Sequence, residues 1–206
     1  MKNVLIHGLG QNDKAWDIVI KELPDIKVTA LNLYNFLKNT KTDYDTLLAS
    51  FTDYCNGFDE KLNLCGLSLG GILALDYVKK HPEKVNSIIL IGTPYKIHKL
   101  LFKAQNLIFH LIPKSTFEKI GMEKKNFIYL VNSMGDLNIS NNLNKIKCPV
   151  LILCGRMDKQ NMKGAELLNK NIKNSTFKVV DNATHEVNVD NPQKLAKLIA
   201  DFWHGV

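Results

Sequence analysis

Arginine is almost missing from this sequence of 206 residues, in which Arg156 is the only one. Proteins that read nucleic-acid bases or bind phosphates favour the planar fork of the arginine side chain, which lysine does not offer. The sequence also holds none of the usual nucleic-acid-binding motifs. We therefore expect no nucleic acid among the partners of this protein.

Long apolar stretches are missing as well. No run approaches the roughly 18 to 20 apolar residues that a membrane-spanning helix needs. The apolar stretch at the start of the chain is too short for a secretory signal, which needs roughly 7 to 15 apolar residues. We therefore expect a cytoplasmic protein without stable membrane insertion, whose cysteines are free thiols. Because the sequence has no C-x-x-C pair, we expect no zinc site formed by cysteines. The cysteines are Cys55, Cys65, Cys148 and Cys154.

Positive charge is abundant, but it is concentrated in one segment. The formal net charge is +7, and residues 94–148 hold nine lysines against three acidic residues. A lysine-rich surface in contact with water is the simpler interpretation. The other interpretation is that the lysines attract an anionic ligand or an acidic partner.

Apolar patterns predict strands and helices that alternate along most of the chain. Such alternation is typical of an α/β protein, with a mostly parallel six-stranded sheet flanked by helices on both faces. The strands are predicted over residues 4–7, 27–33, 62–65, 85–91, 150–154 and 176–180, and the named helices over residues 12–23, 44–58, 70–80 and 192–203.

One segment breaks this alternation. Residues 94–147 carry apolar side chains at helical spacing and predict a helical lid inserted above one end of the sheet. The core domain is then made of residues 1–93 and 148–206. The apolar residues that indicate helices in the insertion include Leu100, Leu101, Leu107, Ile108 and Leu111.

The motif with clear chemical meaning is Gly66-Leu67-Ser68-Leu69-Gly70, which matches G-x-S-x-G directly after a predicted strand. A serine on a sharp turn between a strand and a helix presents its hydroxyl at the edge of the sheet. Side chains two residues before and after the serine would collide, so glycine is needed at both places. Ser68 is therefore the candidate nucleophile.

A serine nucleophile needs a base and a carboxylate that orients the base. His185 follows the predicted strand 176–180, and Asp158 follows the strand 150–154, so both lie where a parallel sheet places its ligands. The alternative for Asp158 is a turn or helix-cap aspartate. Asp136, Asp181 and Asp190 are less favourably placed, and His7 is interpreted as a residue that braces the first loop.

The negative charge that develops on the substrate needs two backbone N–H donors. The amide of Leu69, directly after the serine, is one candidate. Leu9, in the loop after the first strand, is the other. Together these residues predict a complete site with nucleophile, base, acid and oxyanion hole.

At this point the sequence resembles the α/β-hydrolase superfamily, and within it the small carboxylesterases. The resemblance implies a serine hydrolase that forms an acyl-enzyme on Ser68, acts on a small ester, and needs no cofactor or metal. Two features depart from the family. Its two leading strands are absent, and the proline often found after the acid is missing from residues 158–161. The residues that carry the resemblance are His7 to Gly10, Gly66 to Gly71, Gly155, Asp158 and Ala183 to Glu186.

Several functions remain open beside ester hydrolysis. The opening of the chain also resembles the pimeloyl-carrier-protein methyl ester esterases, which would make an acidic carrier protein a partner and an anionic ester or thioester a substrate. Peptidase and lyase activities are further alternatives, and so is a receptor or scaffold that keeps the fold without catalysis. Dinucleotide and zinc-protease motifs fail, because position 13 is Asp13 and position 189 is Val189.

Overall fold

The computed structural model describes residues 1–97 and 108–206. Leu100, Leu101 and Leu107, which the sequence places on helical turns, lie outside the described residues. Among the described residues, no helix is both long enough and apolar enough to cross a membrane.

A single sheet of six strands forms the centre of the molecule, in the order β2-β1-β3-β4-β5-β6. Every neighbouring pair is parallel, which confirms the predicted fold class. The chain order changes direction beside β1, and ligands of such sheets bind at the carboxyl ends of the strands near this point. The strands are β1 (Lys2–Ile6), β2 (Val28–Leu31), β3 (Leu62–Leu67), β4 (Val85–Ile91), β5 (Val150–Gly155) and β6 (Ser175–Val180).

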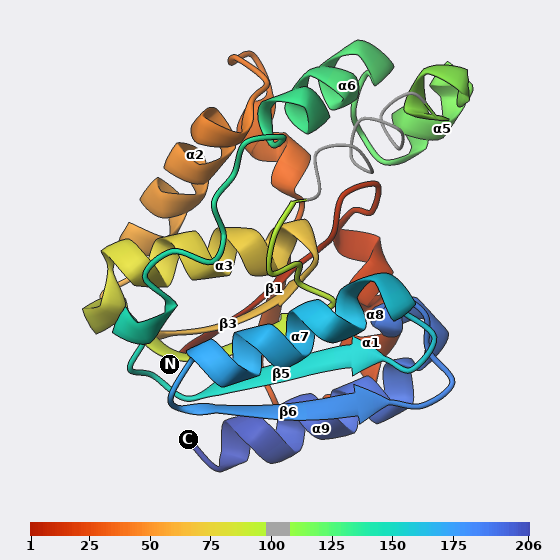
Figure 1. The fold of residues 1–206 in the computed structure, drawn as a ribbon. Coiled ribbons are helices and arrows are strands. Elements are labelled where there is room, and N and C mark those ends of the chain that lie inside the picture. The colour runs from red at the N-terminus through yellow and green to blue at the C-terminus, as the bar shows by residue number, and fades with distance from the viewer. Residues whose placement is uncertain (98–107) are drawn as a thin grey trace.

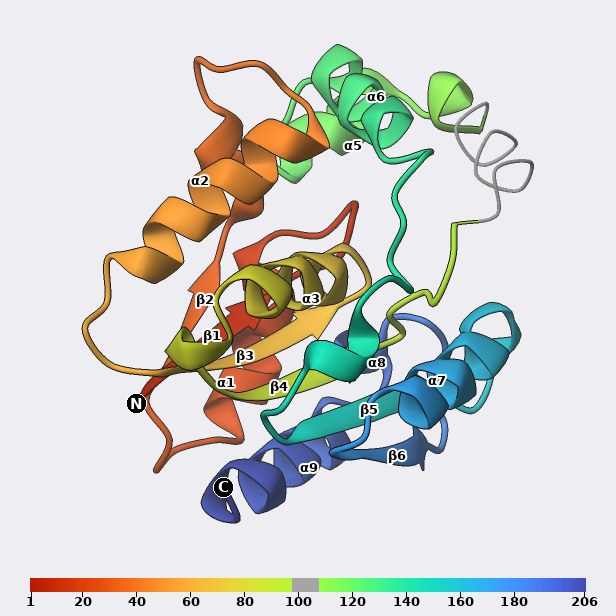
Figure 2. The ribbon, with the colours of Figure 1, turned by 60° about the vertical axis from the view of Figure 1, so that its left-hand side comes forward.

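Helices cover both faces of the sheet (Figures 1 and 2). One face carries α2 (Tyr44–Asn56), α3 (Leu69–Lys80) and α7 (Lys159–Asn171). The other face carries α1 (Asp17–Lys21) and α9 (Pro192–His204). The remaining short elements of the core are η1 (Asp13–Trp16), η2 (Leu33–Leu37), η3 (Pro82–Lys84) and α8 (Val187–Asp190).

The core consists of two apolar layers, one on each side of the sheet. Successive residues of β4 point to opposite faces, so Ile88 packs in the layer under α2, α3 and α7, whereas Ile89 packs in the layer over α1 and α9. Both side chains are fully buried. The near-continuous apolar runs of the central strands therefore follow from a sheet that is covered on both sides.

The described part of the insertion forms α5 (Lys114–Lys119), α6 (Lys124–Ser133) and η4 (Leu143–Lys145). It lies beyond the sheet, with α6 beside α2 (Figures 1 and 2). Several hydrogen bonds fasten it to the core. Among them, the Tyr44 amide donates to Ser133 Oγ at 2.9 Å, and Lys79 Nζ donates to the Ile139 carbonyl at 2.8 Å.

Three local predictions differ from the structure. The helix expected over residues 12–23 is split into η1 and α1, and the strand expected over residues 27–33 ends at Leu31, where the Asn32 side chain caps η2. The sequence analysis also did not name α7. This helix buries only Ala165 and Leu168 among its 13 residues, so its apolar pattern is weak.

Candidate active site

Ser68 lies on a strained turn between β3 and α3. Its φ is 51°, in the left-handed region that is costly for a side chain, and its amide donates to the Ile91 carbonyl at 2.8 Å. A Cβ on Gly66 would overlap the backbone of Gly70, and a Cβ on Gly70 would overlap the carbonyl of Ile6. The two glycines of the motif are therefore required by the close contact of three backbone segments.

The loop after β1 approaches the same turn. A Cβ built on Gly8 would lie 3.5 Å from the Cβ of Ser68. The Gly10 amide donates to the hydroxyl of Tyr34 at 2.9 Å, and the Gln11 amide donates to the Gly8 carbonyl at 3.2 Å. Within the described chain, the amides of Leu9 and Leu69 donate to no protein acceptor, so both stay free to bind an anionic oxygen.

His7 holds this loop and does not act on Ser68. Its Nδ1 bonds to the Gly8 carbonyl at 2.8 Å, and its Nε2 accepts the Leu33 amide at 3.0 Å. Both ring nitrogens are therefore used by the backbone, which requires a neutral imidazole. Burial lowers the pKa of His7 to about 4, although the bond to Gly8 and the charge of Asp13 act in the opposite direction.

Asp158 and His185 are joined directly, as the sequence predicts for an acid and its base. His185 Nδ1 lies 2.8 Å from Asp158 Oδ2, the Asp158 side chain is 5% exposed, and that of His185 is 38% exposed. Burial alone would raise the pKa of Asp158. The hydrogen bond and charge of His185, together with hydrogen bonds from Asn161, outweigh it and lower this pKa. Asp158 is therefore ionised at neutral pH.

The structure confirms the alternative interpretation of Asp158 as a helix cap. Asp158 is the N-cap of α7, where its side chain accepts a hydrogen bond from the Asn161 amide at 3.3 Å. The residue predicted as the acid is thus also a helix cap. The other aspartates near His185 have different partners: Asp181 pairs with Arg156, and Asp190 accepts from the amide and hydroxyl of Thr184.

Gly92 lies directly against the acid and the base, and the sequence analysis missed it. It follows β4 with a φ of 52°. A Cβ at this position would lie 2.9 Å from His185 Nδ1 and 3.3 Å from Asp158 Oδ2. A glycine after a strand at the carboxyl edge of the sheet was the signal that could have revealed it.

Gly155 and a pair of amides fix the segment that carries His185. A Cβ on Gly155 would overlap the Thr184 carbonyl, so no side chain fits between β5 and this segment. On its other side, the buried side chains of Gln11 and Asn188 exchange two hydrogen bonds of 3.2 and 3.1 Å. Gln11 also donates to Glu186 at 3.1 Å, which ties the loop of Leu9 to the residue after His185.

The five predicted residues therefore lie on adjoining parts of one sheet edge. Ser68 follows β3, Gly92 follows β4, Asp158 follows β5 and His185 follows β6, in the order in which the strands pair. The base and acid are hydrogen-bonded, whereas the Ser68 hydroxyl makes no hydrogen bond to His185 within the described residues. Asn161, Gln11 and Asn188 also contribute to this site, and no motif marks them.

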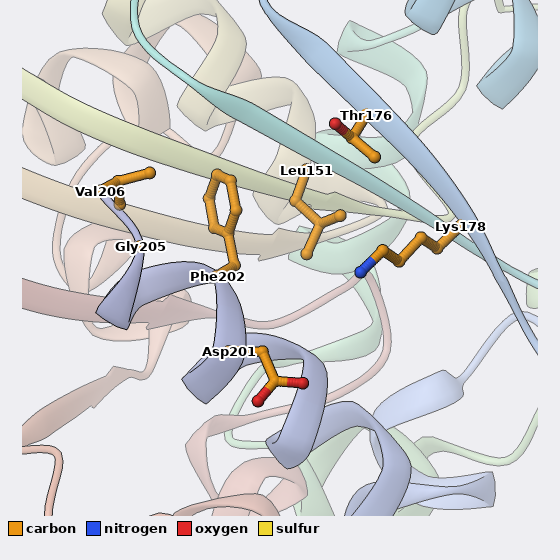
Figure 3. A pocket seen from close by; sticks show the side chains of 7 residues that line it. All are labelled: Leu151, Thr176, Lys178, Asp201, Phe202, Gly205 and Val206. Carbon is orange, nitrogen blue, oxygen red and sulfur yellow. The ribbon is translucent and has the colours of Figure 1, made fainter.

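Two surface hollows lie outside this constellation. One, of about 200 Å³, is formed at the amino ends of β5 and β6 beside α9 and is lined by Leu151, Lys178 and Phe202 among others (Figure 3). The other, of about 370 Å³, lies where the chain leaves the core after β4 and is lined by Tyr95, Ile97 and residues 135–140. None of the five predicted site residues lines either hollow.

Comparison with known proteins shows the family of this fold. The family model of the alpha/beta hydrolase fold matches residues 4–109. The chain belongs to the α/β-hydrolase fold family. The resemblance seen in the sequence motifs is thereby confirmed.

Two relatives align with nearly the whole chain. The monoacylglycerol lipase ABHD6 of Mus musculus is 25% identical over 97% of this chain and 74% of its own length. A putative 2-succinyl-6-hydroxy-2,4-cyclohexadiene-1-carboxylate synthase of Bacillus subtilis (strain 168) is 22% identical over 97% and 89%. The solved structure of a thermophilic esterase from Thermogutta terrifontis has a TM-score of 0.84 at 19% identity, covering 100% of this α/β-hydrolase and 90% of that chain. This last likeness shows the fold.

Gly92→Ala is expected to disable the site. The new methyl group would press on His185 Nδ1 and Asp158 Oδ2, and the left-handed backbone would add strain. We expect kcat to fall by at least about 100-fold, since displacement of catalytic groups by about 1 Å has this effect. The measurement is steady-state hydrolysis of an activated ester.

Gly121→Ala is the matched control for this change. Gly121 also has a positive φ, of 87°, but no atom lies within 4 Å of its built Cβ. It therefore carries the backbone strain, of order 1 kcal/mol, without the contact with the site. Equal losses of kcat in the two variants would contradict the steric explanation.

His7 should make stability depend on pH in the acid range. Its pKa in the folded protein is about 4, below the ordinary 6.5. Between these pH values the unfolded chain therefore binds a proton at His7 that the folded protein does not bind. The free energy of unfolding should therefore fall as pH decreases from 6.5 towards 4, by up to about 3 kcal/mol from this group. Urea unfolding at a series of pH values measures it.

The variant His7→Asn should flatten this dependence, because an amide donates and accepts hydrogen bonds without titrating. His204→Gln, at the exposed end of α9, is the control and should keep the wild-type curve. A wild-type slope that survives in His7→Asn would show that other groups cause the acid sensitivity.

Proposed function

We propose that this α/β-hydrolase cleaves carboxylic esters through an acyl-enzyme intermediate, with Ser68 as nucleophile, His185 as base and Asp158 as the orienting carboxylate. The observation that carries the proposal is the 2.8 Å hydrogen bond between His185 and an ionised Asp158, at the same edge of the sheet as the strained turn of Ser68. Esterases and lipases among the relatives and structural neighbours support it.

Acylation begins when Ser68 Oγ attacks the ester carbonyl and its proton passes to Nε2 of His185. Nδ1 keeps its hydrogen and donates it to Asp158, which stabilises the imidazolium without taking the proton. The carbonyl oxygen becomes an oxyanion, for which the free amides of Leu9 and Leu69 are the proposed donors. The loss of one such donor typically costs about 3 to 4 kcal/mol of transition-state stabilisation.

The tetrahedral intermediate then collapses and releases the alcohol. His185 gives its proton to the leaving alkoxide, and the acyl group stays on Ser68. Water deprotonated by His185 attacks this acyl-enzyme, and the acid product and free Ser68 are formed. The proposed mechanism requires no metal or cofactor.

We propose that the insertion at 94–147 serves as a lid for this edge of the sheet, from its described residues 94–97 and 108–147. The hydrogen bonds of Ser133 and Ile139 to α2 and α3 anchor its returning end. Its described lysines at positions 114, 119 and 125 are exposed and leave an anionic ester, or an ester or thioester on an acidic carrier protein, as substrates to be tested. A cytoplasmic location also stays a prediction.

Ser68→Ala is expected to abolish ester hydrolysis. Removal of a serine nucleophile costs about 10⁶-fold in kcat in comparable triads, because the acyl-enzyme no longer forms. Turnover of p-nitrophenyl acetate, butyrate and octanoate by the wild type and the variant measures this loss. Ser115→Ala, on exposed α5, is the control and should keep full activity.

Labelling with a serine-directed fluorophosphonate separates the alternatives. Labelled Ser68 without ester turnover would point to another substrate class, such as a thioester, an amide or the lyase substrate of the Bacillus relative. Neither turnover nor labelling would favour a receptor or scaffold and would contradict the proposal.

If the lysine-rich insertion attracts anionic substrates, salt should weaken their binding selectively. Raising the salt concentration from about 0.05 M to about 0.5 M shortens the screening distance about threefold. We expect KM for a p-nitrophenyl hemisuccinate to rise several-fold, while KM for the uncharged butyrate changes little. Equal changes in the two KM values would contradict an electrostatic role for these lysines.

A further inference from the structure

Asn161 makes an unusual set of contacts at the start of α7. Its side-chain Nδ2 lies 3.0 Å from Asp158 Oδ1, 2.9 Å from Asp158 Oδ2 and 3.2 Å from His185 Nδ1. The side-chain nitrogen thus faces the whole carboxylate and the ring nitrogen that the carboxylate binds. No part of the mechanism above uses this side chain.

The orientation of the amide follows from its neighbours. An ionised carboxylate only accepts hydrogen bonds, so the NH₂ group of Asn161 must face it, because the carbonyl oxygen would be repelled. His185 Nδ1 carries a hydrogen that it donates to the same Asp158 Oδ2. Asn161 and His185 therefore share one oxygen, and the positive end of the amide dipole lies beside the imidazole.

A purely structural role would have a different geometry. The third residue of a helix commonly reaches back to the backbone amide of the N-cap residue. Here the Asp158 amide already donates to the Gly155 carbonyl at 3.0 Å, and the Asn161 backbone amide itself completes the cap. The side-chain NH₂ group of Asn161 is thus available to donate to the carboxylate of Asp158.

We propose that Asn161 is a positioning residue that holds both oxygens of Asp158 and limits how strongly this carboxylate draws a proton onto His185. The proposal rests on the proposed function, since it concerns the same base. With Asn161 present, hydrogen bonds neutralise part of the negative charge of Asp158, so less of this charge acts on the imidazole of His185. His185 then stays neutral, and able to accept the proton of Ser68, at lower pH.

Among the residues that the structure describes, the other charged groups around His185 have partners or face water. The turn of Asp158 also carries the exposed Lys159. In the segment of His185, Glu186 accepts from Gln11, and Asp190 accepts from Thr184. The end of β4 and the first loop approach this segment with the uncharged Gly92 and Gln11.

Asn161→Ala should move the acid limb of kcat/KM to higher pH. The loss of two donors leaves more of the charge of Asp158 to His185, so the imidazolium persists to higher pH. We expect a shift of about one pH unit in the acid limb, or about tenfold in proton affinity. The measurement is hydrolysis of p-nitrophenyl butyrate across pH.

Two further variants complete the test. Asn161→Asp keeps the shape but places a second carboxylate beside His185, so its acid limb should move further in the same direction. Gln160→Ala, exposed on the same turn, is the matched control and should reproduce the wild-type profile. An unmoved acid limb in Asn161→Ala, even with reduced thermal stability, would overturn the proposal.

The resting protein can be tested without any substrate. The ring nitrogens of His185, assigned by comparison with His185→Gln, can be titrated by ¹⁵N NMR in the wild type and in Asn161→Ala. A higher midpoint in the variant supports the proposal even where ester hydrolysis itself fails, and equal midpoints overturn it. Failure of the proposed function is read separately, from the absence of turnover and of labelling at Ser68.

Discussion

Close contact between glycine backbone segments at the end of β3 is the constraint on which the site depends. The chain can turn sharply at Ser68 only because Gly66 meets Gly70, and Gly70 meets the carbonyl of Ile6, with no side chain between them. These contacts bring α3 onto β1 and β3 and force Ser68 into a left-handed conformation. The cost of this strain is carried by the packed sheet, and the serine hydroxyl is held at the edge of the sheet.

The same solution recurs at the next two strands. β4 is followed by Gly92, whose missing side chain leaves room for His185 against Asp158, and β5 ends in Gly155, on which the carbonyl of Thr184 rests. A segment that starts at the outer strand β6 can therefore pass across β5 towards β4. Asp158 and His185 are held at the edge of Ser68 by these two close approaches, each of which excludes any side chain larger than hydrogen.

The sequence was sufficient to predict the sheet, because strands covered on both faces have continuous apolar runs. Ser68 and Asp158 each follow such a run, and His185 follows the partly exposed edge strand β6, so their gathering at one edge followed from parallel pairing. Gly92 and Asn161 could not be found in this way. A glycine after a strand indicates a turn or a close approach but does not say which side chains it meets, and an asparagine within a helix carries no chemical signal. Their importance arises only from their distance to His185, which depends on how β4, β5 and β6 pack.

The two sets of partners of Asp158 link α7 to His185. The hydrogen bond and charge of His185 lower the pKa of Asp158 despite its burial, and the hydrogen bonds that this N-cap carboxylate accepts from Asn161 add to the effect. A buried carboxylate with no other partner would hold an imidazolium tightly and leave a base that is protonated at neutral pH. Hydrogen bonds from a helix N-terminus neutralise part of the charge of a carboxylate, so its attraction for an imidazolium at His185 is weaker. The cap carboxylate therefore divides its hydrogen bonds between the imidazole of His185 and the start of α7.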